Sequence, residues 1–335
     1  MKLRILSEAD CRMAMDMVAA IDVQAEAFSL LAQGLSVEGL RSFAASEEPA
    51  GVAIFNPCFL REGKGYGIKV ISDFYDNERK GKIRMSGLVA LFDGETGHPH
   101  TLLEGGYLTD LRTGAGTGLA ARHLARRDSR TVAVIGAGRV ARNQLWALAE
   151  ALDLERVFLA TRSEQRGREF VQRMQAMRGR VPRDIALVES REEAVRNADI
   201  VVAATTSHEP VFCGAWLKPG TFVAAVGAYE DAMREVDSET IRRASKLVID
   251  SRTDCLDNAG DLVIPIKEGI IAREQVAEIA EIVSGKRPGR ENDSEITYYK
   301  SIGVPIQDLL TAQHMARTAA KKGVGIEIDI GGDSD

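Results

Sequence analysis

The stretch VAVIGAGRVA, from Val132 to Ala141, decides the fold of this 335-residue chain. A buried-type strand leads into the pattern GxGxxA, and a helical pattern follows. Gly136 permits the tight turn, Gly138 lets the backbone approach a pyrophosphate, and Ala141 permits close packing of the helix on the strand. Because the free N–H groups of a helix start face the phosphates, the stretch predicts a dinucleotide site. The residues assigned to the cofactor here are Gly136, Ala137, Gly138, Arg139 and Val140.

Strands and helices alternate downstream of this stretch. Predicted strands cover residues 131–135, 157–160, 185–188, 200–203, 222–226 and 247–249, and predicted helices cover 140–152, 164–177, 192–197, 273–284 and 306–321. Alternation with continuous apolar strands is typical of a doubly wound parallel sheet with helices on both faces. The fold class is therefore α/β, with a Rossmann domain over residues 119–305.

The residues before this unit follow another pattern. A helical repeat of apolar residues covers 7–31, and short β-rich runs at 51–60, 65–72 and 86–92 are separated by turn residues. The last helix, at 306–321, is expected to return to this first part of the chain. We therefore predict a discontinuous α+β domain over residues 1–118 and 306–335, for substrate binding and dimerisation.

Composition excludes several classes of function. Apolar residues make up 45% and charged residues 27%, as in ordinary globular proteins, and the net charge of −6 is dispersed, which argues against nucleic acid. No stretch approaches the roughly 18 apolar residues of a membrane span, and the start of the chain leads into no signal core. We expect a cytoplasmic protein without membrane contact. The cysteines and histidines show no metal-ligand spacing, so no metal is predicted.

The segment after the second strand of the Rossmann unit indicates which cofactor binds. An acid there accepts the ribose hydroxyls of NAD, whereas a base pairs with the 2′-phosphate of NADP. The strand ends in Thr161, Arg162 and Ser163, with Arg166 shortly after, and no acid follows the strand tip. These residues favour NADP(H) over NAD(H), although Arg162 is alternatively a solvated arginine at a helix start.

Five blocks resemble, in order, the ornithine cyclodeaminase and mu-crystallin family. They are GIKV at 67–70, GYLTDLRT at 106–113, the glycine fingerprint, AATTS at 203–207 and KSIGVPIQD at 300–308. Together they span nearly the whole chain. Within the family, the N-terminal start and the GYLTD motif are similar to those of the cyclodeaminase-like proteins of ectoine-utilisation clusters.

The resemblance implies a homodimer that holds a small amino or imino acid against the nicotinamide. It places Arg41, Lys69 and Arg112 at the substrate carboxylate, and Lys69 also assists proton movement. Guanidinium forks and an ammonium can fix a carboxylate beside the reacting carbon. For Arg41 the alternative is a surface arginine at a helix end. The same resemblance places Thr205, Thr206 and Gly227 at the cofactor.

Two positions depart from the family. Cyclodeaminases carry an aspartate where this chain has Tyr229, and a phenol with an ordinary pKa of about 10 is a poor base. Tyr229 is thus a hydrogen-bond donor at the site, unless Glu230 or Asp231 on the same loop serves as the base. Arg84 replaces a small hydroxyl residue and suits a second substrate anion; alternatively it is an outward-facing strand charge.

These observations favour an NAD(P)H-dependent oxidoreductase that reduces the C=N bond of an imino or ketimine acid, or oxidises the corresponding amino acid. One alternative is a cyclodeaminase that uses bound NAD+ and releases ammonia. Another is a non-catalytic protein that binds NADP(H). A reductase consumes free reduced cofactor stoichiometrically, whereas a cyclodeaminase returns its hydride.

Overall fold

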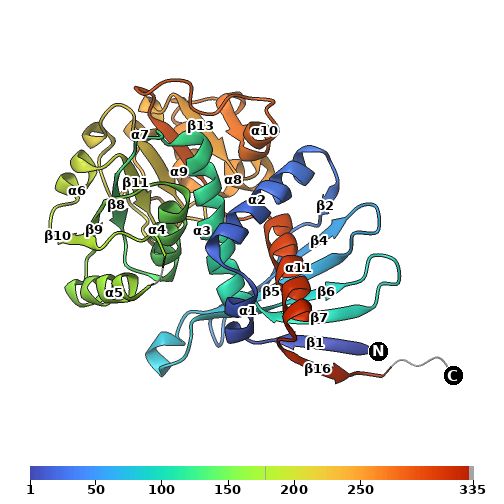
Figure 1. Cartoon of the computed structure of the whole chain (residues 1–335). Coiled ribbons are helices and arrows are strands. Elements are labelled where there is room, and N and C mark those ends of the chain that lie inside the picture. The colour runs from blue at the N-terminus through green and yellow to red at the C-terminus, as the bar shows by residue number, and fades with distance from the viewer. Residues whose placement is uncertain (178, 332–335) are drawn as a thin grey trace. The chain divides into compact units, whose positions relative to one another are not determined.

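The structure of the chain is a computed structural model that describes residues 1–177 and 179–331. It consists of two compact units (Figure 1): unit 1 joins Met1–Arg112 to Val304–Asp335, and unit 2 is Thr113–Gly303. Residues 332–335 of the predicted discontinuous domain lie outside the described residues. No described helix is long and apolar enough to cross a membrane.

Unit 2 contains an eight-stranded sheet in which every pair of neighbours is parallel. The order is β10 (Asp184–Val188), β9 (Arg156–Ala160), β8 (Thr131–Ile135), β11 (Ile200–Ala203), β12 (Phe222–Ala225), β15 (Thr297–Lys300), β13 (Lys246–Ile249) and β14 (Val276–Glu278). From β8 the chain builds outward through β9 to β10, then returns to β11 on the other side of β8. Ligands bind at such a switch point, beyond the carboxyl ends of the strands. The predicted α/β doubly wound sheet is confirmed.

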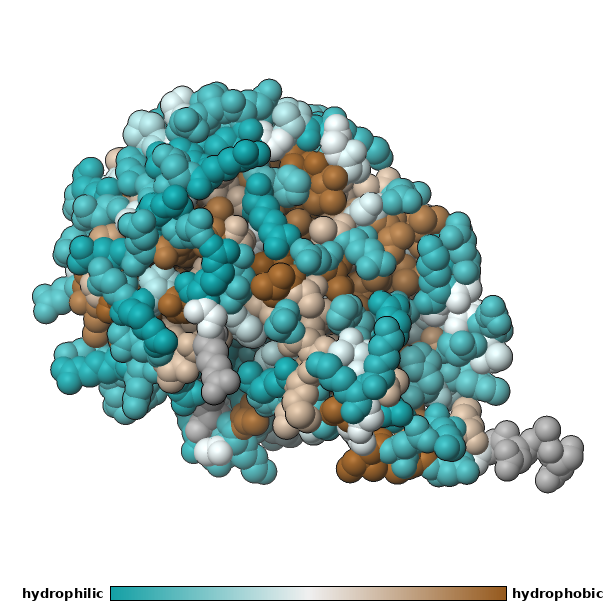
Figure 2. All heavy atoms as spheres, in the orientation of Figure 1, coloured by the Kyte–Doolittle hydropathy of each residue, from teal (hydrophilic) through white to brown (hydrophobic). Residues whose placement is uncertain are grey.

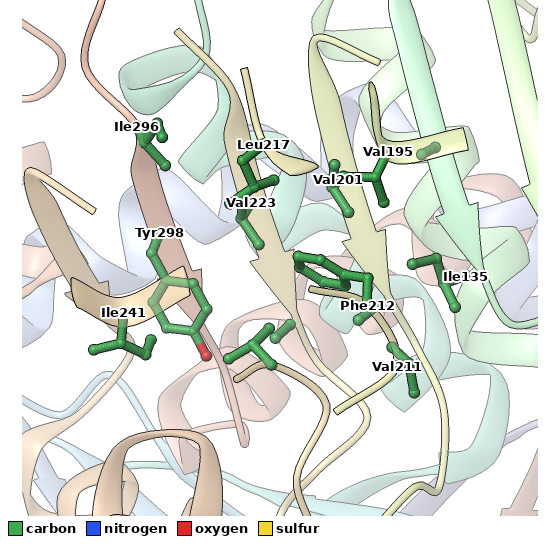
Figure 3. Packing of buried hydrophobic residues seen from close by; sticks show 14 of the residues in the cluster. Ile135, Val195, Val201, Val211, Phe212, Leu217, Val223, Ile241, Ile296 and Tyr298 are labelled. Atoms are coloured by element: carbon green, nitrogen blue, oxygen red, sulfur yellow. The ribbon is translucent and has the colours of Figure 1, made fainter. Parts of the chain in front are cut away.

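Helices surround this sheet, and its central strands are buried along their whole length. The helices are α4 (Arg139–Ala151), α5 (Glu164–Ala176), α6 (Arg191–Asn197), α7 (Ser238–Arg243), α8 (Arg252–Asn258), α9 (Gly260–Lys267) and α10 (Ile279–Val283). Figure 3 shows part of the core, where Phe212 and Leu217 lie against Val201 and Val223 of β11 and β12.

The predicted helix at 273–284 is wrong. A short 3₁₀ turn, Arg273–Gln275, leads into β14, and only Ile279–Val283 is helical. Val276 is fully buried and pairs with Leu247 of β13. Pairing with the edge of the sheet therefore outweighs the local helical pattern.

Unit 1 contains a mixed sheet that is covered by helices on one face. Its strands are β1 (Lys2–Leu6), β2 (Ser36–Glu38), β3 (Ser42–Ser46), β4 (Gly51–Leu60), β5 (Tyr66–Phe74), β6 (Met85–Phe92), β7 (Pro99–Glu104) and β16 (Ile326–Asp329). Helix α11 (Pro305–Lys322) packs on β4, β5 and β6, and α1 (Glu8–Ala14) and α2 (Met17–Ala32) pack on α11. Every second residue of β5, including Lys69, is buried on this covered face.

Two helix boundaries differ from the prediction. The predicted helix at 7–31 is two helices, because Asp16 caps a new helix by accepting a hydrogen bond of 2.8 Å from the Ala19 N–H. The small residues after the GYLTDLRT block predict a helix at 114–123, but helix α3 (Gly105–Leu124) begins nine residues earlier. Its first N–H groups, at Gly106 and Tyr107, donate to the Glu104 carboxylate at 2.6 and 2.7 Å. The GYLTDLRT block, and Arg112 with it, is therefore helical.

Candidate active site

A buried cluster of charged side chains lies in unit 1. The carboxylate of Asp308 joins two cations. Its Oδ2 lies 2.6 Å from Lys69 Nζ, and its Oδ1 accepts a hydrogen bond from Arg112 Nε at 2.9 Å. The exposed fractions of Lys69, Arg112 and Asp308 are 3%, 6% and 3%. Charges at this depth require partners, and here each cation has one.

Each member of the cluster comes from a different element. Lys69 is on β5, Arg112 is on α3, and Asp308 is in the first turn of α11, where the helix dipole also stabilises a carboxylate. Beside them, Gln307 Oε1 accepts from the Val304 N–H at 3.0 Å and from Arg112 Nη1 at 3.4 Å. This network fixes the Arg112 guanidinium in one orientation.

Arg41 lies at the edge of the same cluster. Its Nε donates to Asn56 Oδ1 at 3.1 Å, and Asn56 on β4 is the register partner of Lys69 on β5. Asn56 and Lys69 therefore point to the same face of the sheet. The structure thus brings Arg41, Lys69 and Arg112 together around Asp308, and the Glu38 carboxylate lies close by, where it accepts from the Ile306 N–H at 3.1 Å.

The pKa values of the cluster depart from their ordinary range. Burial lowers the pKa of Lys69 to about 8, with a smaller lowering effect from Arg112 and against the opposing effect of Asp308, which raises it. Burial raises the pKa of Asp308, but Arg112 and Lys69 outweigh that effect and hold it below its usual value. At neutral pH the cluster holds an ionised carboxylate and an ammonium that can release a proton, as a general acid requires.

Arg84 has a different partner. Its Nε and Nη2 donate to the two oxygens of the buried Asp73 carboxylate at 2.7 and 3.0 Å. Asp73 lies four residues beyond Lys69 at the far end of β5. Arg84 thus makes a bidentate pair that holds the strand end.

The residues predicted to bind the dinucleotide lie in unit 2. Gly136 has a φ of +111°, and a Cβ there would lie 2.5 Å from the Ala204 carbonyl oxygen, so only glycine fits. Gly138 is the N-cap of α4, no side chain caps that helix, and a Cβ on Gly138 would meet no atom within 4 Å. Open space before the uncapped helix start fits a pyrophosphate.

The remaining predicted cofactor residues lie in loops that follow the strands. Ser163 caps α5 by accepting from the Arg166 N–H at 3.3 Å, and Arg162 and Arg166 are exposed. Thr205 and Thr206 follow β11, and Gly227 follows β12. Tyr229 is half-buried in that second loop, and Glu230 and Asp231 beside it are exposed. The described residues contain no group of His, Cys, Asp and Glu side chains that could hold a metal.

Several residues of these sites were not predicted from the sequence. Asp308 is the last residue of the KSIGVPIQD block, but the local sequence does not identify it as the partner of Arg112, which lies 196 residues earlier. Asn56 has no sequence signal. In unit 2, Glu235, Asp261 and Lys300 are completely buried. In the sequence, what could have indicated their burial is a charged residue next to apolar residues.

Comparisons with known proteins agree with this arrangement. The model of the ornithine cyclodeaminase/mu-crystallin family matches residues 1–323. A Delta(1)-pyrroline-2-carboxylate reductase from Bacillus cereus is 37% identical over 83% of this chain and 84% of its own. An alanine dehydrogenase from Archaeoglobus fulgidus is 33% identical over 98% of both chains. The solved Delta(1)-pyrroline-2-carboxylate reductase of Thermococcus litoralis, in complex with NADH and L-proline, matches with a TM-score of 0.92 and 37% identity, over 97% of this chain and 100% of that one.

Proposed function

Because the chain belongs to the ornithine cyclodeaminase/mu-crystallin family, we propose that it reduces the C=N bond of a cyclic 2-imino acid such as pyrroline-2-carboxylate. Its class is an NAD(P)-dependent oxidoreductase of imino or amino acids. The observation that carries the proposal is the buried cluster in which Lys69 and Arg112 share the Asp308 carboxylate and burial lowers the pKa of Lys69 to about 8.

Each side chain has a separate task in this proposal. Arg112 and Arg41 hold the substrate carboxylate, because a guanidinium fork matches its two oxygens. Lys69 gives a proton to the imine nitrogen. Asp308 orients Lys69 and Arg112 and keeps Lys69 charged. The bound nicotinamide supplies the hydride. Tyr229 donates a hydrogen bond, since a protonated phenol cannot serve as the base that ring closure requires.

The proposal is tested with a panel of imino acids in the presence of NADPH or NADH. The panel contains five- and six-membered ring imino acids, an open-chain imino acid and iminosuccinate. We expect the ring compounds to be reduced with the highest kcat/KM, because the pairing of Arg84 with Asp73 supports a structural role for that arginine. A preference for iminosuccinate would assign Arg84 to a second substrate carboxylate instead.

The dinucleotide site is proposed to prefer NADP(H). Arg162 and Arg166 are exposed beside Ser163, and hydrogen bonds to a charged group stabilise by about 1.5–3 kcal/mol. We therefore expect NADPH to bind about ten-fold or more tightly than NADH, and Arg162→Asp to reverse the preference. Arg173→Asp on α5 is the matched control, since it makes the same charge change and should leave the ratio as it is. Equal dissociation constants of the parent protein for the two cofactors would exclude this assignment.

The uncovered face of the sheet in unit 1 is proposed as the homodimer interface. Register partners on β4, β5 and β6 build it, and the ring of Tyr66 stacks on Phe59 at 5.5 Å and on Phe92 at 4.7 Å. Other members are Phe55, Pro57, Ile68, Val70, Leu88 and Ala90. Every large hydrophobic side chain described as exposed lies in unit 1, Phe59 and Leu88 of this face among them, and Figure 2 shows several hydrophobic patches on the surface, one of them over β16. Such patches mark interfaces.

We expect sedimentation to show a dimer at micromolar concentration. Leu88→Asp should shift it to monomer, because the side chain is 51% exposed on the apolar face and a charge there would be buried in the interface. Met13→Asp changes an exposed methionine on α1, away from that face, and should leave the dimer intact. A parent protein that sediments as a monomer would contradict the assignment.

A further inference from the structure

The two loops that follow β11 and β12 are held by one buried carboxylate. Glu235 Oε1 accepts hydrogen bonds from the N–H and the hydroxyl of Thr205, at 2.6 and 2.9 Å. Its other oxygen, Oε2, accepts from the N–H groups of Gly227 and Ala228, at 2.6 and 3.1 Å. All four donors come from the two loops, so this single side chain fixes the distance between them.

A second carboxylate and a lysine hold Glu235 itself. Asp261, at the start of α9, accepts from the N–H groups of Glu235 and Val236 through Oδ1, at 2.7 and 3.0 Å. Its Oδ2 lies 2.8 Å from Nζ of Lys300, the last residue of β15. The side chains of Lys300 and Asp261 are completely buried, and the positive charge of Lys300 lowers the pKa of Glu235 against the larger effect of burial, which raises it.

Close packing between the loops leaves little freedom. A Cβ added to Gly227 would collide with the backbone of Thr205, and it would lie 2.6 Å from Glu235 Oε1. Each oxygen of Glu235 accepts hydrogen bonds from one of the two loops. The side chain must therefore be a carboxylate, and it must be long enough to reach both loops. An isosteric amide would turn an N–H₂ group toward donors and lose at least one of these bonds.

We propose that Glu235 is a positioning residue for the nicotinamide half of the cofactor. The inference rests on the proposed dinucleotide site, in which Thr205, Thr206 and Gly227 contact the cofactor. The four hydrogen bonds that Glu235 accepts come from the loops after β11 and β12, whereas the glycine turn after β8, which receives the pyrophosphate, meets the first of these loops through the close approach of Gly136 to the Ala204 carbonyl. Loss of Glu235 thus weakens the part of the site beyond β11 and β12 while the pyrophosphate and adenosine part stays intact.

The test compares two ligands in each variant. For the Glu235→Gln protein, we expect the dissociation constant of the preferred reduced cofactor, NADPH or NADH, to rise at least ten-fold. The constant of the matching ADP-ribose, with or without the 2′-phosphate, should change less than about two-fold. Binding is measured by calorimetry, so the readout does not depend on activity.

Asp199→Asn is the matched control. Asp199 is also a buried acceptor on this sheet, and its Oδ2 accepts from the N–H groups of Arg130 and Thr131 at 2.9 and 3.0 Å, but at the amino end of β8 and β11. It should leave both dissociation constants unchanged. If Glu235→Gln does not fold, Glu235→Asp keeps the charge and shortens the reach, and the same selective loss is expected.

Two results would overturn the proposal: unchanged cofactor affinity in a folded variant, or an equal loss of affinity for the cofactor and for ADP-ribose. Failure of the proposed dinucleotide site gives a different result, because the parent protein would then bind neither NADPH nor NADH.

Discussion

Lys69→Met is expected to lower kcat/KM for the imino acid by about 10²–10⁴-fold, the range that a positioned general acid contributes. Lys69 is the group in the cluster that can lose a proton near neutral pH, because burial brings its pKa to about 8. Methionine keeps much of the side-chain volume and removes the ammonium. Dissociation constants for NADPH and NADH should stay within about two-fold, since the cofactor site is proposed to lie in unit 2.

The pH profile of the parent enzyme separates this role from a merely structural one. A lysine that acts as an acid must be protonated, so kcat/KM is level below its pKa and falls as pH rises through about 8. Lys64→Met, in the exposed turn between β4 and β5, is the control and should change neither the rate nor the profile. A Lys69→Met enzyme with parental turnover would remove this residue from the reaction.

Asp308→Asn is expected to destabilise the protein by about 3–5 kcal/mol, the cost of removing one partner from a buried ion pair. The substitution keeps the shape of the side chain but leaves the ammonium of Lys69 and the guanidinium of Arg112 facing each other without a carboxylate. Chemical denaturation measures the change in the free energy of unfolding. Glu8→Gln, which breaks an exposed pair with Arg12, should change it by about 0.5 kcal/mol or less.

The same variant has a second expected effect. Because Asp308 raises the pKa of Lys69, its loss should move the bend in the pH profile of kcat/KM from about 8 to a lower pH. A bend that stays in place, together with parental stability, would contradict the assigned role of Asp308.

The Rossmann unit could be predicted because its signals are local. A buried strand, a glycine turn and a helix follow one another within VAVIGAGRVA, and strand β8 covers the five residues predicted for it. Strand β14 could not be predicted in this way, because Val276 and Ala277 belong to a helical pattern and become a strand only by pairing with β13.

In the candidate site too, some residues could be predicted from the sequence and others only from the fold. Lys69 and Arg112 were predicted because a resemblance to a family identifies positions one at a time. No role was predicted for Asp308, since an acidic residue in the first turn of a helix is common and is stabilised by the helix dipole. Only the folded structure shows that the two oxygens of Asp308 join Lys69 of β5 and Arg112 of α3.

The central claim is that hydride passes stoichiometrically from the reduced cofactor to a C=N bond. The most direct measurement incubates pyrroline-2-carboxylate with NADPH or NADH and follows cofactor absorbance together with the amino acid formed. We predict one reduced cofactor oxidised for each proline that appears. Ammonia released from ornithine with catalytic NAD+, with no net change in cofactor absorbance and no reduction of the imino acid, would contradict the account.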